Sequence, residues 1–323
     1  MNFAIIGTNF ISDNFCEAAK SVPEAEITAV YSRAEGTGCA FAHKHGIKKV
    51  YTDLNALLAD KEIDAVYVAS PTLLHKEHSI RAMAAGKDVL CEKMIGTENS
   101  DFLEMAEAAK KYGRVLTEAM RPDFDPNMKI IADATKRLGK IRRASFEYCQ
   151  YSSRYDRFLR GELTNAFDPG MKNSALSDIG IYPLHFCVRL FGRPIGLNSK
   201  SVFLEGGFEG LGTIILDYGD MLATVTYSKI TESVIPSVID GELGSLIFDR
   251  VNSPTRAKLK FRDGTEENLP ITPYKNNMNF EISEFIKQVK EKRTNPYFDI
   301  SAEAMRLVDL AYKSSGVSFP HCE

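Results

Sequence analysis

Three side chains that can bind or exchange protons share one stretch of the sequence. Asp178 and Tyr182 are four residues apart and His185 follows three residues later, a spacing that places all three on one face of a helix predicted from Ser177 to Leu190. A phenol, with an ordinary pKa near 10, transfers a proton at neutral pH only beside a cation, whereas an imidazole ordinarily titrates near pH 6.5. The sequence leaves open which ring carries the proton. The structural alternative is a helix-start aspartate, a core tyrosine and a core histidine.

A cation suited to such proton chemistry follows a predicted buried strand. Lys93 comes shortly after the strand at Val89 to Cys91. Its ammonium could stabilise a developing alkoxide and lower the pKa of a neighbouring phenol. The structural alternative is an ion pair with Glu92.

A glycine turn lies between the first predicted strand and the first helix. At this position in a βαβ unit, free backbone N–H groups and the positive helix end meet a dinucleotide pyrophosphate. Asn9 and Ser12 occupy the usual second and third glycine positions, and both residue types can adopt or tolerate the turn. A plain strand-to-helix turn is the alternative. The candidate cofactor residues of this turn are Gly7, Thr8, Asn9, Phe10 and Ile11.

The end of the second predicted strand bears on the choice between NAD and NADP. An acidic residue here would bind a free ribose 2′-hydroxyl, but the sequence reads Tyr31-Ser32-Arg33. Arg33 therefore predicts a 2′-phosphate and NADP, with NAD still possible. A solvated loop arginine is the alternative.

These candidate residues lie on two different patterns of predicted elements. Residues 1–120 alternate short apolar runs with amphipathic helices, which predicts a doubly wound parallel sheet, a Rossmann domain. In residues 121–323 strands follow strands, and the turns Asp217 to Asp220 and Arg262 to Thr265 predict hairpins. The fold class is therefore α/β, with a second domain built on a large open, mainly antiparallel sheet. The last helix, about Ser301 to Ser314, is a candidate to pack back on the first domain.

Composition excludes several classes of partner. Lys and Arg number 40 against 43 Asp and Glu, so no net charge favours nucleic acid or anionic lipid. The six cysteines form no CxxC pair and no His and carboxylate groups have ligand spacing, so no metal site is expected. No apolar run approaches the length of a membrane span and no signal peptide is evident, which predicts a cytoplasmic protein.

Several segments together resemble one known family. They are Ala69 to His75, which contains Pro71 and His75; Ala85 to Met94, which contains Glu92 and Lys93; Glu118 to Arg121 with Pro126; Ser177 to His185; and Ile239 to Ser245. In this order they resemble the glucose-fructose oxidoreductase, inositol dehydrogenase and MocA (Gfo/Idh/MocA) family over nearly the whole chain. Met94 replaces the proline that usually follows the lysine. Lys172-Asn173-Ser174 stands where relatives often carry glycines.

The resemblance implies an NAD(P)-dependent oxidoreductase that transfers a hydride to or from a sugar, polyol or dihydrodiol. Lys93 would stabilise the substrate oxygen, Tyr182 or His185 would carry the proton, and Asp178 would bind hydroxyls. A homodimer or homotetramer is expected. The alternatives are an inactive cofactor-binding sensor and an NAD-dependent glycoside-cleaving enzyme. The further residues that the resemblance implies are Ser70, Pro71, His75, Glu92 and Arg121 for the cofactor, and Lys172 for the substrate.

Overall fold

A computed structural model describes residues 1–162 and 164–319, which form two compact units. The first unit comprises Met1–Phe124 and Asn276–Asp299, and the second comprises Asp125–Lys275 and the chain from Ile300 onward. The segment that returns to the first unit carries α10 (Met278–Glu291), and α11 (Phe298–Ser315) belongs to the second unit from Ile300 on. None of the helices in the described residues is long and apolar enough to cross a bilayer.

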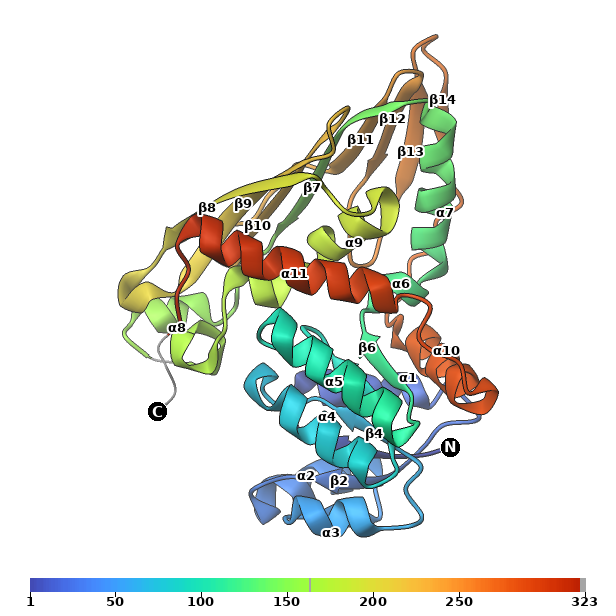
Figure 1. The fold of residues 1–323 in the computed structure, drawn as a ribbon, viewed down its shortest axis with the longest axis vertical. Coiled ribbons are helices and arrows are strands. Elements are labelled where there is room, and N and C mark those ends of the chain that lie inside the picture. The colour runs from blue at the N-terminus through green and yellow to red at the C-terminus, as the bar shows by residue number, and fades with distance from the viewer. Residues whose placement is uncertain (163, 320–323) are drawn as a thin grey trace. The chain divides into compact units, whose positions relative to one another are not determined.

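The first unit is built on a six-stranded, wholly parallel sheet (Figure 1). In sheet order its strands are β3 (Lys49–Tyr51), β2 (Glu26–Tyr31), β1 (Asn2–Ile6), β4 (Ala65–Val68), β5 (Asp88–Glu92) and β6 (Leu116–Ala119). The strand order reverses between β1 and β4, which is the point where ligands bind in open α/β sheets. Its helices are α1 (Phe10–Ala19), α2 (Glu35–His45), α3 (Leu54–Ala59), the short η1 (Thr72–Leu74), α4 (His75–Ala84), α5 (Asn99–Tyr112), α6 (Arg121–Phe124) and α10 (Met278–Glu291).

An aromatic core explains why α10 belongs to the first unit. The rings of Phe15 and Tyr67 stack at 3.8 Å between centroids, and Phe3 lies 5.8 Å from Phe15. Phe285 of α10 contacts Phe3 at 5.9 Å, and Met278, Ile282 and Ile286 of the same helix are buried in this core. Burial of these side chains stabilises the unit by roughly 1.5 to 3 kcal/mol each.

The second unit is built on an eight-stranded sheet in which only β7 and β10 pair in parallel. In sheet order its strands are β14 (Glu266–Asn268), β13 (Ala257–Phe261), β12 (Gly244–Phe248), β11 (Ser237–Gly241), β7 (Ile141–Cys149), β10 (Leu222–Ser228), β9 (Glu209–Asp217) and β8 (Gly196–Phe203). Its longer helices α7 (Pro126–Thr135), α9 (Ile181–Phe191) and α11 (Phe298–Ser315) lie along one face of the sheet in Figure 1. Short turns complete it: η2 (Lys136–Leu138), α8 (Tyr155–Leu159), η3 (Asn165–Phe167), η4 (Pro169–Met171), a π-helical turn (Leu176–Gly180) and η6 (Glu205–Gly207).

The predicted fold class is confirmed, because a parallel sheet precedes a mainly antiparallel one. One predicted element differs. The helix expected from Ser177 to Leu190 is divided into the π-helical turn Leu176–Gly180 and α9.

Candidate functional site

Gly7 directly follows β1 at the point where the strand order of the first unit reverses. Its φ is +114°, and a Cβ at this position would lie 2.5 Å from the carbonyl oxygen of Ala69, which follows β4. Any side chain would therefore collide with the neighbouring strand end. This close approach leaves backbone accessible beside the start of α1, which fits a dinucleotide pyrophosphate.

Asn9, in the usual second glycine position, joins two strand ends. Its side-chain oxygen accepts hydrogen bonds from Ile11 N at 3.0 Å and Ser12 N at 3.2 Å, capping α1. Its amide donates to Ala69 O at 2.8 Å. Thr8 is half-buried and Phe10 is 63% exposed. The turn is thus held in place by its own polar residue while its neighbours stay accessible.

The end of β2 offers a cation and no acid. Ser32 is buried, and its hydroxyl donates to Ala34 O at 3.0 Å. Arg33 is exposed, and within residues 1–162 and 164–319 it has no ion-pair partner. Its guanidinium can therefore bind a phosphate bidentately.

His75 fixes the chain after β4 and after β5. Its Nδ1 lies 2.8 Å from Met94 O and its Nε2 lies 2.8 Å from Ser70 O. Burial lowers the pKa of His75 to about 4 and outweighs the two carbonyl acceptors, so the ring is neutral near pH 7 and donates only one of these hydrogen bonds at a time. His78 Nδ1 lies 2.9 Å from the hydroxyl of Ser70. His75 is thus placed to hold the segment of Ser70 and Pro71, both of which stay half-buried.

The loop that carries Lys93 is anchored along its length. Met94 O is held by His75 as described, and Ile95 N donates to the buried Glu118 at 3.1 Å. Thr97 donates from both its backbone nitrogen and its hydroxyl to Asp101, at 2.9 and 2.7 Å. The peptide bond between Lys93 and Met94 is cis. Every residue from Met94 to Thr97 is buried, whereas Lys93 is only half-buried. The ammonium of Lys93 is therefore the accessible group of a fixed loop.

Buried charges surround the base of this loop. Glu92 accepts a hydrogen bond from the Tyr67 hydroxyl and one from Lys93 N at 3.2 Å. Burial raises the pKa of the Glu92 carboxyl, and the charges of Lys93 and Arg121 oppose that rise. The charge of Arg121, a predicted cofactor residue, thus also favours the ionised form of Glu92.

Glu281 of α10 was not singled out from the sequence, although it lies close enough to act on this cluster. Its side chain is fully buried, and both carboxyl oxygens have no hydrogen-bond partner in the described part of the chain. Burial first, and then the charge of Glu92, raise the pKa of Glu281 well above its ordinary value. A charged residue on an amphipathic helix ordinarily points to solvent, so the pattern gave no signal for it.

In the second unit, the π-helical turn is held by buried side chains from distant strands. Leu176 N donates to Glu209 Oε2 at 3.0 Å, and Tyr227 donates to Glu209 Oε1 at 2.8 Å. A Cβ on Gly180 would lie 2.6 Å from Cγ of the Tyr227 ring. The hydroxyls of Ser174 and Tyr312 lie 2.9 Å apart. The Tyr227 ring leaves no room for a side chain at Gly180, and the other contacts are consistent with the departure from α-helical geometry at this turn.

Asp178 is the one half-exposed residue between Ser174 and Val188. Its carboxylate lies 2.9 Å from the ammonium of Lys229, a residue that sequence reasoning missed. Tyr182, four residues on, is buried, and its ring centroid lies 5.8 Å from that of Tyr148. The hydroxyl of Tyr148 accepts from Asn252 Nδ2 at 3.0 Å. The turn thus presents an ion-paired carboxylate, and the phenol four residues further along the chain is buried in α9.

His185 differs from Asp178 in exposure. It is buried, and its Nε2 lies 3.4 Å from the hydroxyl of Ser301 on α11. Burial, aided by the charge of Arg189, lowers the pKa of His185 to about 3. The predicted single polar face therefore differs from the structure, and His185 has the surroundings of a core histidine. Lys172 is half-buried and has a φ of +52°.

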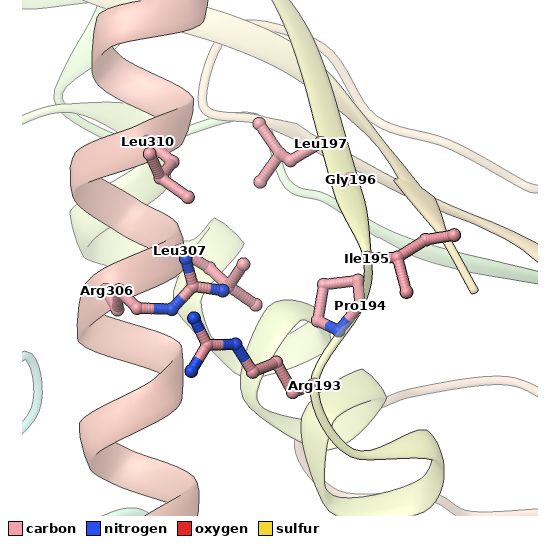
Figure 2. A pocket seen from close by; sticks show the side chains of 8 residues that line it. All are labelled: Arg193, Pro194, Ile195, Gly196, Leu197, Arg306, Leu307 and Leu310. Atoms are coloured by element: carbon pink, nitrogen blue, oxygen red, sulfur yellow. The ribbon is translucent and has the colours of Figure 1, made fainter. Parts of the chain in front are cut away.

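A cavity of about 410 Å³ in the second unit lies between the start of β8 and α11. Among the residues that line it, Arg193 and Arg306 point toward one another in Figure 2. Arg306 is already paired with Glu303 at 2.5 and 2.8 Å. None of the predicted site residues lines this cavity.

No group of three or more potential metal ligands gathers in the described residues. In the first unit, the structure supports dinucleotide binding at the ends of the parallel strands, where Lys93 is accessible. In the second unit, it provides the carboxylate of Asp178 and the phenol of Tyr182.

Comparisons with known proteins point in the same direction. A family model described as an oxidoreductase family with an NAD-binding Rossmann fold matches residues 1–120. The chain is 40% identical over 323 residues to scyllo-inositol 2-dehydrogenase (NADP(+)) of Bacillus subtilis, covering 99% of this chain and 98% of that protein. A 3-ketoreductase from Actinomadura kijaniata, solved with NADP and TDP-benzene, has a TM-score of 0.88 at 22% identity, with 98% of both chains covered. A levoglucosan dehydrogenase, solved with NADH and levoglucosan, has a TM-score of 0.87 at 18% identity, covering 98% of this chain and 97% of that one.

Proposed function

The chain belongs to the Gfo/Idh/MocA family of NAD(P)-dependent oxidoreductases that act on CH–OH groups, and from this membership we propose that it oxidises or reduces a sugar, a polyol such as an inositol, or a dihydrodiol. One observation carries the proposal. The only accessible residue on the fully anchored loop after β5 is Lys93, an ammonium at the sheet edge where the residues also fit a dinucleotide.

The turn from Gly7 to Ile11 and Arg33 would hold the cofactor, whose nicotinamide would supply or accept the hydride. Lys93 donates a hydrogen bond to the substrate oxygen and stabilises negative charge that develops there. Tyr182 gives or takes the hydroxyl proton as its phenol, aided by the positive charge of Lys93. Asp178 accepts hydrogen bonds from substrate hydroxyls and sets their orientation. Lys172 is a further proposed substrate contact.

We propose NADP as the preferred cofactor, since Arg33 has a free guanidinium and no acid stands at the end of β2. A charge-assisted bond to the 2′-phosphate contributes roughly 1.5 to 3 kcal/mol. Arg33→Ala should therefore weaken NADPH binding by about tenfold or more and leave NADH binding almost unchanged. Fluorescence titration of both cofactors measures this. Equal affinities of the parent protein for NADPH and NADH would contradict the preference.

A substrate panel tests the activity. NADPH oxidation and NADP reduction are followed with aldoses, inositols, dicarbonyl sugars and aromatic diols. We expect turnover of at least one polyol or sugar. Tight NADPH binding with no turnover of any compound would favour the sensor alternative. Release of an aglycone from a glycoside without net cofactor reduction would favour glycoside cleavage.

We propose a cytoplasmic homodimer or homotetramer, with the open face of the second unit's sheet as the subunit contact. Strand register places the exposed Val202, Ile215 and Leu222 on the same face of β8, β9 and β10. The same register also places Lys200 and Thr213 on this face, so it is mixed in polarity, and the exposed apolar side chains on it favour association. Light scattering at micromolar concentration should give a multiple of the 36.0 kDa chain mass, and a single chain mass would refute the proposal.

A further inference from the structure

Lys229, the residue after β10, is a buried cation in the second unit. Its side chain is 4% exposed, and its ammonium donates to Ala166 O at 2.7 Å. The same ammonium lies 4.7 Å from the ring centroid of Phe167 and 5.3 Å from that of Phe208. Both rings are fully buried. The positive charge is thus removed from water and placed on two aromatic faces.

The backbone of Lys229 is fixed on both sides. Its N–H donates to Gly210 O at 2.9 Å, and its carbonyl accepts from Ser152 N at 2.9 Å. Just before it, the hydroxyl of Ser228 accepts from Ile230 N at 3.1 Å and from Thr231 N at 2.9 Å. The main chain of Lys229 is therefore fixed by these bonds, and its ammonium is held by its own contacts with the Ala166 carbonyl and the two rings.

Only a carboxylate can compensate this buried charge at low cost, and Asp178 provides one at 2.9 Å. The two side chains differ in exposure, 4% for Lys229 and 45% for Asp178. Lys229 therefore contacts the carboxylate from the protein interior, while the carboxylate still faces solvent. The pair carries no net charge, so it does not attract a charged substrate, whereas its carboxylate remains a strong acceptor for hydroxyl groups.

We propose that Lys229 is a positioning residue, which orients the carboxylate of Asp178 so that the site binds the hydroxyls of an uncharged polyol or sugar. This inference rests on the proposed function. Lys229 itself does not touch the substrate, because its ammonium is buried and already engaged.

The test compares Lys229→Met, which keeps the aliphatic length and removes the charge, with Lys258→Met. Lys258 pairs with the exposed Glu266 at 3.1 Å in the same unit and is the matched control. We expect Lys229→Met to raise KM for the best polyol by about 10- to 100-fold, with a smaller effect on kcat and none on NADPH affinity. Lys258→Met should match the parent. Parent-like KM in Lys229→Met, with lower thermal stability, would overturn the proposal.

A double-mutant cycle removes the dependence on one variant. Asp178→Asn leaves a buried cation without its carboxylate, whereas Lys229→Met with Asp178→Asn buries no unpaired charge and should fold at least as well. If Lys229 acts through Asp178, the double variant and Asp178→Asn should have the same KM. A further tenfold rise in the double variant would overturn the proposal.

Binding measurements separate this inference from the proposed function. Scyllo-inositol and levoglucosan are titrated calorimetrically into the NADPH complex of the parent protein and of Lys229→Met. If the parent binds a polyol without turning it over, and Lys229→Met binds it at least tenfold more weakly, the proposed function fails and the inference stands. Equal binding by parent and variant would overturn the inference, whatever the turnover. So would the absence of binding of both probes to the parent.

Discussion

The loop Lys93–Thr97 of the first unit and the turn Leu176–Gly180 of the second are held in place by different kinds of neighbour. The loop is anchored by His75, Glu118 and Asp101, which lie 19, 23 and 4 residues from their partners in the sequence. The turn is anchored by Glu209, 33 residues from its partner, and its neighbour Ser174 contacts Tyr312, 138 residues away. One region is therefore stabilised by its own βαβ neighbourhood, and the other by residues from across the second unit.

This difference has physical consequences. Close partners are brought together when the local βαβ units form, at a low cost in chain entropy. Distant partners meet only when the whole sheet of the second unit is assembled. In addition, Glu209 and Lys229 bury charge, so the turn depends on polar groups that are costly to leave unpaired. We expect the first region to tolerate change in its surroundings better than the second.

The largest expected effect is at the phenol of Tyr182, which follows the turn at the start of α9. Tyr182→Phe keeps the ring and its packing but removes the exchangeable proton, so kcat should fall by about 10² to 10⁴ and the alkaline limb of the pH profile should disappear. The thermal unfolding temperature should not change. Steady-state rates from pH 5 to 10 measure this.

His185→Asn is the matched variant, because His185 is buried and neutral at the assay pH. It should lower stability and leave the shape of the pH profile unchanged. An active Tyr182→Phe together with an inactive His185→Asn, and a profile that breaks near pH 6.5, would identify the histidine as the proton carrier.

The next effect is at the lysine of the loop. Lys93→Met removes a positive charge that acts mainly in the transition state, so kcat should fall by about 10² to 10³ while NADPH affinity changes little. Lys111→Met, an exposed lysine of α5, is the control. If NADPH binding were lost in proportion to kcat, Lys93 would belong to the cofactor site alone.

Gly180→Ala tests how tightly the turn is packed. The added Cβ would lie 2.6 Å from the buried Tyr227 ring, and overpacking of this kind costs about 1 to 3 kcal/mol of unfolding free energy. Gly36→Ala is the control, since nothing lies within 4 Å of a Cβ there and α2 should gain stability. Urea unfolding compares the two, and equal midpoints would show that the turn yields more easily than its contacts indicate.

The same contrast explains what could be predicted from the sequence. Gly7, Pro71 and Lys93 follow strands whose order and spacing are visible in the chain, because a parallel sheet brings the ends of its strands to one edge. Asn9 was predicted to tolerate the turn, yet its bond to Ala69 O depends on the pairing of β1 with β4. The spacing of residues along the chain is therefore enough to predict the motif. It is not enough to predict the polar contacts that the motif's residues make.

The second unit gave fewer signals for the same physical reason. A spacing of four residues predicts a shared helix face only if the helix is α-helical, and Glu209 and Tyr227 impose a π-helical turn instead. Lys229 follows an ordinary strand, and a lysine at a strand end usually faces solvent. Its burial depends on Phe167 and Phe208, whose positions no local pattern indicates.

The last expected effect concerns the one fully buried carboxyl of the first unit whose oxygens have no hydrogen-bond partner in the described chain. Burial and the charge of Glu92 raise the pKa of Glu281 well above its ordinary value, so the group is protonated in the folded state and ionises on unfolding. Stability from such a group is fully present below the unfolded pKa and is lost as pH rises toward the folded pKa, by about 1.4 kcal/mol per pH unit.

Glutamine cannot ionise, so Glu281→Gln tests this. The unfolding free energy of Glu281→Gln relative to the parent should therefore increase from pH 5 to pH 8, whereas Glu291→Gln, on the same helix and exposed, should show a constant difference. Urea unfolding at several pH values measures both variants. If the difference in unfolding free energy between Glu281→Gln and the parent were also constant, Glu281 would be ionised in the folded protein. The first unit would then, like the second, depend on a buried charge that residues distant in the sequence compensate.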